Sequence, residues 1–211
     1  MPRRKTCALP RRAGATLIDA WCFADQLSTP INAFLTVHMA KLDGGGDPLQ
    51  RQGRWRERMA KWLTARGVAP TWLWWREHGR SVGEHYHMLL YIPARHLAAF
   101  RRMVRQRWVQ DGEPGAIDGP KFANGDVSMI GYALKDMTRR DWLAVNMPSK
   151  LWSKLAAKRS QKPVVGKRCG TSENIGRAAI ARYYRALSIP QSSAVALPSS
   201  HNGAERPKEA A

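Results

Sequence analysis

The sequence contains few cysteines and no long apolar run. Three thiols, Cys7, Cys22 and Cys169, are scattered over 211 residues without a CxxC pair. They can neither close completely into disulfides nor supply zinc-ribbon spacing, which favours a reducing compartment. No apolar run approaches the roughly 20 residues that span a bilayer, and the basic first residues lack the apolar segment of a signal peptide. We therefore expect a cytoplasmic protein with no membrane partner.

Several enzyme motifs are also missing. The chain has no HExxH zinc-protease pattern and no G-x-x-x-x-G-K-[ST] loop, because residues 164–171 (VVGKRCGT) lack the first glycine and the hydroxyl residue after the lysine. We expect neither an ATP-driven domain nor a nucleotide cofactor. GRSVG at 79–83 formally matches the nucleophile elbow of hydrolases, but a strand rather than the required helix is expected to follow it.

Acidic residues are scarce and positive charge is abundant. Lysine and arginine total 35 against 16 acidic residues, a formal net charge of +19. Such an excess attracts polyanions, usually nucleic acid. The charge alone would also fit a generally basic soluble surface or binding to anionic lipid. Stretches such as WRERMAKW and RQRW interleave cations with some of the nine tryptophans. Because bases stack on aromatic faces while cations bind phosphates, this pattern favours single-stranded nucleic acid.

Hydrophobic periodicity predicts strands and helices in the order βαββαβα. The expected strands span 32–41, 71–77, 84–92 and, more weakly, 116–123, and the expected helices span 49–67, 94–110, 126–138, 149–159 and 172–187. This order predicts an α+β fold, a small antiparallel RRM-like sheet with helices packed on one face and a C-terminal helical extension. The other face would be free to meet a ligand.

Composition divides the chain into four parts. We expect a basic lead-in, a central α+β domain, a basic helical extension and a Ser-, Pro- and Ala-rich disordered tail. Their predicted bounds are 1–30, 31–145, 146–189 and 190–211.

Two histidines stand one residue apart in EHYHMLLYI at 84–92. Side chains alternate along a strand, so His85 and His87 share one face while an apolar set occupies the other. A hairpin through HGRSVG would place Glu77 across from His85 or nearby. Two imidazoles and a carboxylate can converge on one divalent cation. We therefore predict a metal site formed by His85, His87 and Glu77.

A tyrosine and a lysine stand three residues apart in the stretch DVSMIGYALKDMTRR. On a helix, Tyr132 and Lys135 share a face, and the apolar residues around them form the buried side. Taken alone, the pair fits an interfacial tyrosine beside a solvated lysine equally well.

Three segments, taken in order, resemble the motifs of a known superfamily. FLTVHMA (34–40), EHYHMLL (84–90) and GYALKD (131–136) are similar to those of the HUH endonucleases. The match is to the single-tyrosine rolling-circle replication initiators of small plasmids, single-stranded DNA phages and related viruses. The resemblance covers roughly residues 31–140 and implies that 31–145 is an HUH endonuclease domain.

The resemblance implies a specific chemistry. His85, His87 and Glu77 would bind Mg²⁺ or Mn²⁺, Tyr132 would be the nucleophile and Lys135 its accompanying lysine. The product would be a 5′-phosphotyrosine on single-stranded origin DNA, with a free 3′-hydroxyl to prime synthesis. The step would need no ATP. A host helicase and polymerase, in the cytoplasm of a bacterial host, would be the protein partners.

Further residues are candidates for contact with nucleic acid. Thr36 and His38 share a face of the first strand, and 166–185 is a basic loop and helix that fits either packing or origin-DNA binding. The full candidate set is Thr36, His38, Trp75, Arg76, Arg139, Arg140, Lys167 and Arg168.

Two alternatives stay open. One is a non-catalytic module of similar fold that binds single-stranded nucleic acid, and the other is a single-tyrosine transposase or relaxase. A transposase usually has glutamine rather than lysine after the tyrosine, and a relaxase usually places its tyrosine before the histidines. Lys135 and the motif order therefore favour an initiator. Tyr183 and Tyr184 lie outside the motif and are expected to pack or stack.

Overall fold

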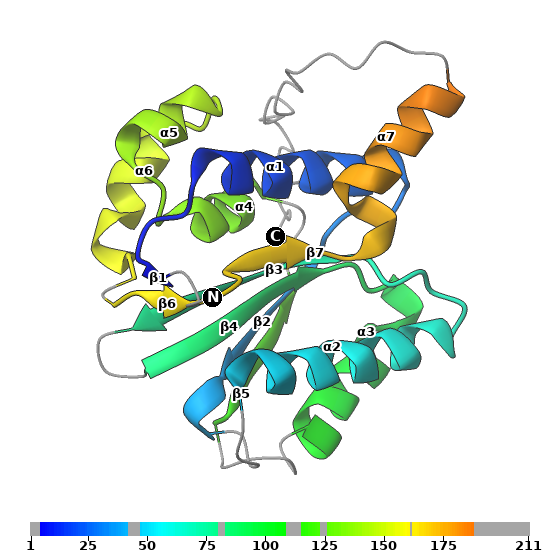
Figure 1. Ribbon diagram of the computed structural model, residues 1–211. Coiled ribbons are helices and arrows are strands. Elements are labelled where there is room, and N and C mark those ends of the chain that lie inside the picture. The colour runs from blue at the N-terminus through cyan, green and yellow to red at the C-terminus, as the bar shows by residue number, and fades with distance from the viewer. Residues whose placement is uncertain are drawn as a thin grey trace, which may run out of the picture.

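Five strands form one antiparallel sheet (Figure 1). The computed structural model describes residues 5–41, 47–79, 83–108, 115–122, 126–160 and 162–187. The strands, in their order across the sheet, are β5 (Ile117–Phe122), β2 (Ala33–His38), β4 (Gly83–Leu90), β3 (Trp72–Gly79) and β7 (Cys169–Thr171). A separate two-stranded sheet pairs β1 (Lys5–Thr6) with β6 (Val164–Val165).

Helices connect and flank the strands. They are α1 (Arg11–Gln26), α2 (Pro48–Thr64), α3 (Leu97–Met103), α4 (Val127–Leu134), α5 (Arg139–Ala144), α6 (Ser149–Leu155) and α7 (Arg177–Ala186). Short helical turns are η1 (Met39–Lys41), η2 (Ala94–His96), η3 (Val104–Trp108), η5 (Ala156–Lys158) and η6 (Glu173–Ile175). Within the described ranges, no helix has the length and apolar character needed to cross a membrane.

The predicted fold class is confirmed. β2, α2, β3, β4, α3 and β5 follow one another as βαββαβ, and their strands pair in the order β5-β2-β4-β3. This is the split βαβ arrangement, in which every neighbouring pair of strands is antiparallel. β7 adds an edge strand that was not predicted, because three residues are too few to show an alternating pattern.

The expected arrangement of helices on one face of the sheet needs correction. Helices α1, α4 and α7 lie above the sheet in Figure 1, and α2 and α3 lie below it. Leu73 and Trp75 of β3 join the core with α1 and α4, whereas Trp72 and Trp74 join the core with α2 and α3. Four consecutive apolar residues in this strand require two buried faces, since alternation sends them to both sides. Neither face is therefore free over its whole width.

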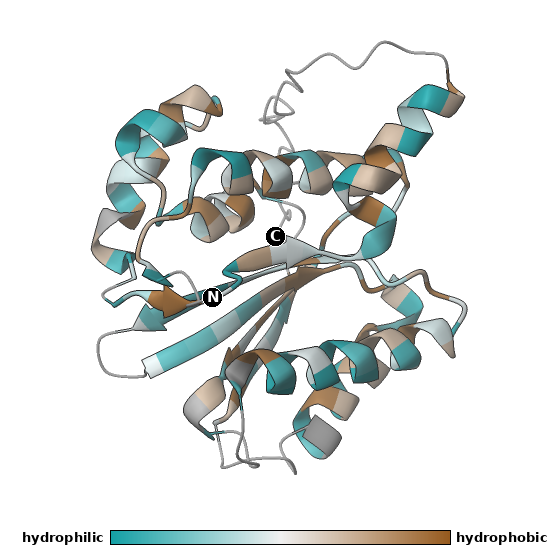
Figure 2. Ribbon diagram, viewed as in Figure 1, coloured by the Kyte–Doolittle hydropathy of each residue, from teal (hydrophilic) through white to brown (hydrophobic). Residues whose placement is uncertain are grey.

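Segments on both sides of the central domain pack into the same core. Residues of α1 such as Leu17 and Trp21 are buried, and Tyr183 of α7 packs edge-on against Phe23 with ring centroids 5.1 Å apart. Figure 2 shows brown apolar positions along the sides of these helices that face the sheet and teal positions outside. The division at residues 30 and 145 stays a prediction. The predicted disordered tail, 190–211, lies outside the described residues.

Candidate functional site

Strand pairing brings the predicted metal ligands to one place. In the β3–β4 hairpin Glu77 lies directly opposite His85. On the other side of β4, β2 places Thr36 opposite His87 and His38 opposite His85. Directly opposite residues of an antiparallel pair project from the same face. The five side chains therefore share the face of the sheet that α1 and α4 cover.

Glu77, His85 and His87 converge closely enough to hold one ion. Their ligand atoms all lie within 4.8 Å of one another, and all three residues are buried. His85 Nε2 lies 2.9 Å from Glu77 Oε1, and His87 Nε2 contacts the same oxygen. Two imidazole nitrogens and a carboxylate oxygen form a donor set that divalent metals accept.

The second nitrogen of each imidazole has its own partner. His87 Nδ1 lies 2.9 Å from Thr36 Oγ1, and His85 Nδ1 lies 3.1 Å from the carbonyl oxygen of Gly83. Because a carbonyl oxygen only accepts, the His85 contact requires a proton on Nδ1. Partners of this kind typically orient metal-binding histidines.

The pKa values of the cluster match the protonation states that a metal requires. Burial raises the pKa of Glu77, but hydrogen bonds with His85 and His87 and the charge of Lys135 outweigh it and hold that pKa well below its usual range. Burial lowers the pKa of His87 to about 4, although Glu77 acts in the opposite direction. At neutral pH Glu77 is therefore ionised and His87 is neutral, as ligands must be.

Tyr132 points its hydroxyl at the same carboxylate. Asp126 caps the start of α4 by accepting a hydrogen bond from the backbone of Ser128 at 2.9 Å. Two turns later, the Tyr132 hydroxyl donates to Glu77 Oε1 across 3.5 Å, and its ring lies edge-on to His87. Burial and the negative charge of Glu77 raise the pKa of Tyr132 above its ordinary value. The phenol is thus protonated at neutral pH and needs help to become a nucleophile.

Lys135 is buried rather than solvated. Its ammonium pairs with Glu77 Oε2 and lies 3.8 Å from the centroid of the Tyr132 ring. Burial lowers the pKa of Lys135, and the Glu77 charge opposes this change. α4 ends at Leu134 and not near 138 as predicted, because Thr138 instead caps α5. One carboxylate thus joins both histidines, the tyrosine and the lysine.

The site opens into a cleft of about 530 Å³. Besides His85, His87 and Tyr132, it is lined by Phe34, Thr36, His38, Asp118, Lys121, Ser128, Met129 and Lys158. Phe34 stacks on His87 with ring centroids 5.4 Å apart. It was not among the predicted site residues, although it stands two residues before Thr36 and therefore projects from the same face of the strand. Lys158 comes from the turn after α6, and no sequence signal connects it to this cleft.

Of the eight residues predicted to contact nucleic acid, two line the cleft and three lie on the exposed surface. Thr36 is buried beneath the histidines, whereas His38 is half-buried in the cleft wall. Arg139, Arg140 and Lys167 are exposed. Their contact with nucleic acid stays a prediction.

The other three candidates for contact with nucleic acid are buried. Trp75 is buried, with its ring centroid 5.0 Å from that of His87. Arg76 is buried, pairs with Glu84 and donates to backbone carbonyls of the β6–β7 segment. Arg168 is buried and pairs with Asp136. The two guanidinium groups are thus engaged inside the fold, and the contact of these three residues with nucleic acid also stays a prediction.

Arg168 and the half-buried Arg159 connect the C-terminal segment to the residues that follow α4. Asp136, which accepts from Arg168, also accepts a hydrogen bond from the backbone of Ser160 at 2.7 Å. Arg159 donates to the carbonyl oxygen of Lys135 at 3.0 Å. These contacts hold the residue after α4 in position beside the carboxylate.

The arrangement brings together a Glu-His-His cluster that could bind a metal ion, a tyrosine hydroxyl within reach of it, a buried ammonium and a cleft. Glu77 comes from β3, both histidines from β4, the tyrosine from α4 and the lysine from the turn after α4. No model of a known protein family matches the chain, and no curated protein matches it either.

Proposed function

We propose that the protein is a metal-dependent DNA nicking and joining endonuclease of the rolling-circle initiator type, which acts on single-stranded origin DNA. One observation carries this proposal. The Tyr132 hydroxyl lies 3.5 Å from the carboxylate oxygen that both histidines contact, inside an open cleft. A tyrosine whose role was only packing would not need its hydroxyl beside the carboxylate oxygen that two imidazoles contact.

The residues fit a divalent cation. Glu77 Oε1, His85 Nε2 and His87 Nε2 would hold it, because the ligand atoms of the three residues lie within 4.8 Å of one another. Mg²⁺ or Mn²⁺ bound there would polarise the scissile phosphate and offset the charge that develops in the transition state.

Tyr132 would act as the nucleophile. Its oxygen attacks the phosphorus, a bond forms between the phenol oxygen and phosphorus, and the bond from phosphorus to the 3′-oxygen breaks. The tyrosine loses one proton and the leaving 3′-oxygen gains one, so atoms and charge balance. Because one phosphoester replaces another, the step requires no ATP and can run backwards to rejoin the ends.

Lys135 would favour the ionised phenol. Its ammonium lies 3.8 Å from the centre of the Tyr132 ring and is fixed there by Glu77. A cation at this distance in a buried site stabilises a developing phenolate far more than it would in water.

The non-catalytic alternative loses part of its support. A module that binds by stacking needs exposed aromatic faces. Six of the nine tryptophans are buried in the two cores: Trp21, Trp55, Trp72, Trp74, Trp75 and Trp142.

A covalent-trapping experiment tests the proposal. The protein is incubated with pooled single-stranded oligonucleotides and Mn²⁺ or Mg²⁺, denatured, and examined for a DNA adduct. We expect an adduct that maps by mass spectrometry to the peptide containing Tyr132 and that disappears with EDTA. The double variant Tyr183→Phe, Tyr184→Phe is the matched control and should form the adduct normally. No adduct, or one on Tyr183 or Tyr184, would contradict the proposal.

A further inference from the structure

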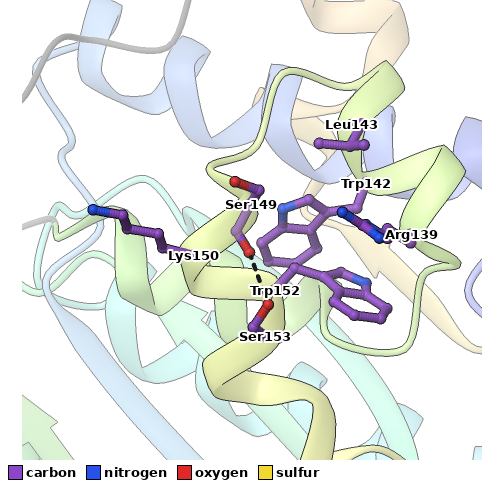
Figure 3. A pocket seen from close by; sticks show the side chains of 7 residues that line it. All are labelled: Arg139, Trp142, Leu143, Ser149, Lys150, Trp152 and Ser153. Carbon is purple, nitrogen blue, oxygen red and sulfur yellow. Dashed lines mark hydrogen bonds between the residues drawn. The ribbon is translucent and has the colours of Figure 1, made fainter.

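A second hollow lies between α5 and α6, apart from the catalytic cleft. It has a volume of about 160 Å³ and is lined by Arg139, Trp142, Leu143, Ser149, Lys150, Trp152 and Ser153. Figure 3 shows the indoles of Trp142 and Trp152 next to each other, with Arg139 beside them. A cavity of about 150 Å³ can hold one benzene ring, so the hollow has room for a single aromatic base.

Trp152 differs from most tryptophans of this chain. Among those whose side chains the structure describes, only Trp62 and Trp152 are not buried. The Arg159 guanidinium lies 4.0 Å from the centroid of the Trp152 ring, and Trp152 Nε1 has no hydrogen-bond partner within the described residues. An accessible indole beside arginine and lysine is the combination that stacks a base and binds its phosphate.

A row of lysines runs from this hollow to the catalytic cleft. Lys150, Lys154 and Lys158 recur every four residues along α6 and the turn that continues it, and all three are exposed. Lys150 lines the hollow and Lys158 lines the cleft. At a helical rise of 1.5 Å per residue the row spans roughly 12 Å, about three nucleotides of a stacked strand.

The hollow is rigidly connected to the nucleophile helix. Leu151 of α6 packs so tightly on Gly131 that a Cβ at position 131 would lie 2.5 Å from Leu151 Cδ2. Gly131 directly precedes Tyr132. A base held against α6 is therefore placed at a fixed position relative to the attacking hydroxyl.

We propose that the α5–α6 hollow binds a base of the single strand that flanks the cleaved phosphate, by stacking on Trp152. The lysine row, Lys150, Lys154 and Lys158, binds the intervening phosphates. This inference rests on the proposed nicking function, because it assumes that a single DNA strand lies in the cleft beside Tyr132. The hollow thus contributes to the register in which the strand is presented to Tyr132.

The test measures binding with strands of different reach. In a Tyr132→Phe background, which cannot cleave, the affinity is measured for a short oligonucleotide confined to the cleavage site and for oligonucleotides extended on the 5′ or the 3′ side. Trp152→Ala should weaken binding of strands extended on one side by about tenfold or more, in the range of one lost stacking contact, and leave the short strand unaffected. Trp152→Phe should restore most of the loss.

Two further measurements separate binding from folding. Trp62→Ala changes the other half-buried tryptophan, on the opposite face of the sheet, and should leave the dependence on strand length intact. The surface pair Lys150→Gln, Lys154→Gln should lower the slope of log affinity against log salt by roughly 1.4, as expected for two lost phosphate contacts on a single strand.

The outcomes distinguish this inference from the nicking proposal. If wild type forms the adduct but the Trp152 and lysine variants bind every strand like their parent, the hollow is not a strand-binding site. If wild type forms no adduct while Trp152→Ala still weakens only the longer strands, the nicking proposal fails and the hollow is supported as a binding site.

Discussion

The two faces of β4 perform different tasks with alternate residues of one strand. His85 and His87 point to the face with Glu77 and Tyr132, whereas Tyr86 and Met88 are buried against α2 and α3 on the other. The first face gathers titratable groups and opens to a cleft, and the second is closed by aromatic and aliphatic packing. Because alternation separates them, the chemistry and the stability of this strand can be altered independently.

The face of β4 that carries His85 and His87 differs from the other face mainly in its buried charges. A carboxylate and an ammonium are both buried there, which costs solvation that only their mutual attraction and hydrogen bonds offset. Removing one partner leaves the other charged and buried. Substitutions on each face should therefore affect activity and stability differently.

Tyr132→Phe should cause the largest change in activity. In the proposed reaction the hydroxyl oxygen is the attacking atom, and the substitution keeps the ring, so adduct formation and strand cleavage should both fall below detection. The melting temperature should stay close to that of wild type. Gel shift of the denatured adduct and circular dichroism measure the two effects, with Tyr183→Phe as the control. Residual adduct in Tyr132→Phe would assign the nucleophile to another residue.

Glu77→Gln should abolish metal binding and also destabilise the fold. The substitution removes the anionic ligand and leaves the Lys135 ammonium buried without its partner, a loss of about 3–5 kcal/mol in the free energy of unfolding. Calorimetric titration with Mn²⁺ and urea denaturation measure these effects.

The double variant Glu77→Gln, Lys135→Met separates the two roles of the carboxylate. It should recover much of the stability because no buried charge remains, but it should not recover Mn²⁺ binding. Equal Mn²⁺ affinity in wild type and Glu77→Gln would show that the carboxylate is not a ligand.

Met88→Ala tests the opposite face of the same strand. It creates a cavity between the sheet and the α2–α3 core and should reduce the free energy of unfolding by about 2–5 kcal/mol. Adduct formation at a temperature where the variant is folded should be retained. His87→Ala, one residue away, should show the reverse result, with cleavage abolished. Equal loss of cleavage in both variants would mean that the two faces are not independent.

Acid should weaken the metal-free protein between about pH 6.5 and pH 4. The pKa of His87 is lowered to about 4 in the folded state, so in this interval the unfolded chain takes up a proton that the folded chain does not. The stability contributed by neutral His87 is therefore present above pH 6.5 and is lost as the pH falls towards 4.

Urea denaturation in EDTA at several pH values measures this effect. The comparison with His87→Asn isolates it from carboxyls such as Asp136, whose raised pKa acts in the opposite direction. Parallel pH profiles for wild type and His87→Asn would exclude the histidine as the source.

Much of the site could be predicted because it depends on local geometry. Alternation alone placed His85 and His87 on one face, and a short hairpin placed Glu77 opposite His85. The α+β order followed from periodicity and turn residues in the same way. Each of these inferences needs only residues that are close in the sequence or joined by a tight turn.

The burial of long charged side chains could not be predicted, because their partners are far away in the sequence. Arg76 ends against carbonyls near residue 165, Arg168 pairs with Asp136, and Lys135 pairs with Glu77. An arginine or lysine on a strand or helix end is exposed unless such a partner compensates its charge, and only folding brings the partner near. The sequence by itself thus determined which residues could meet at the metal cluster. The tertiary packing decided which of the many cations are buried with a partner and which stay at the surface.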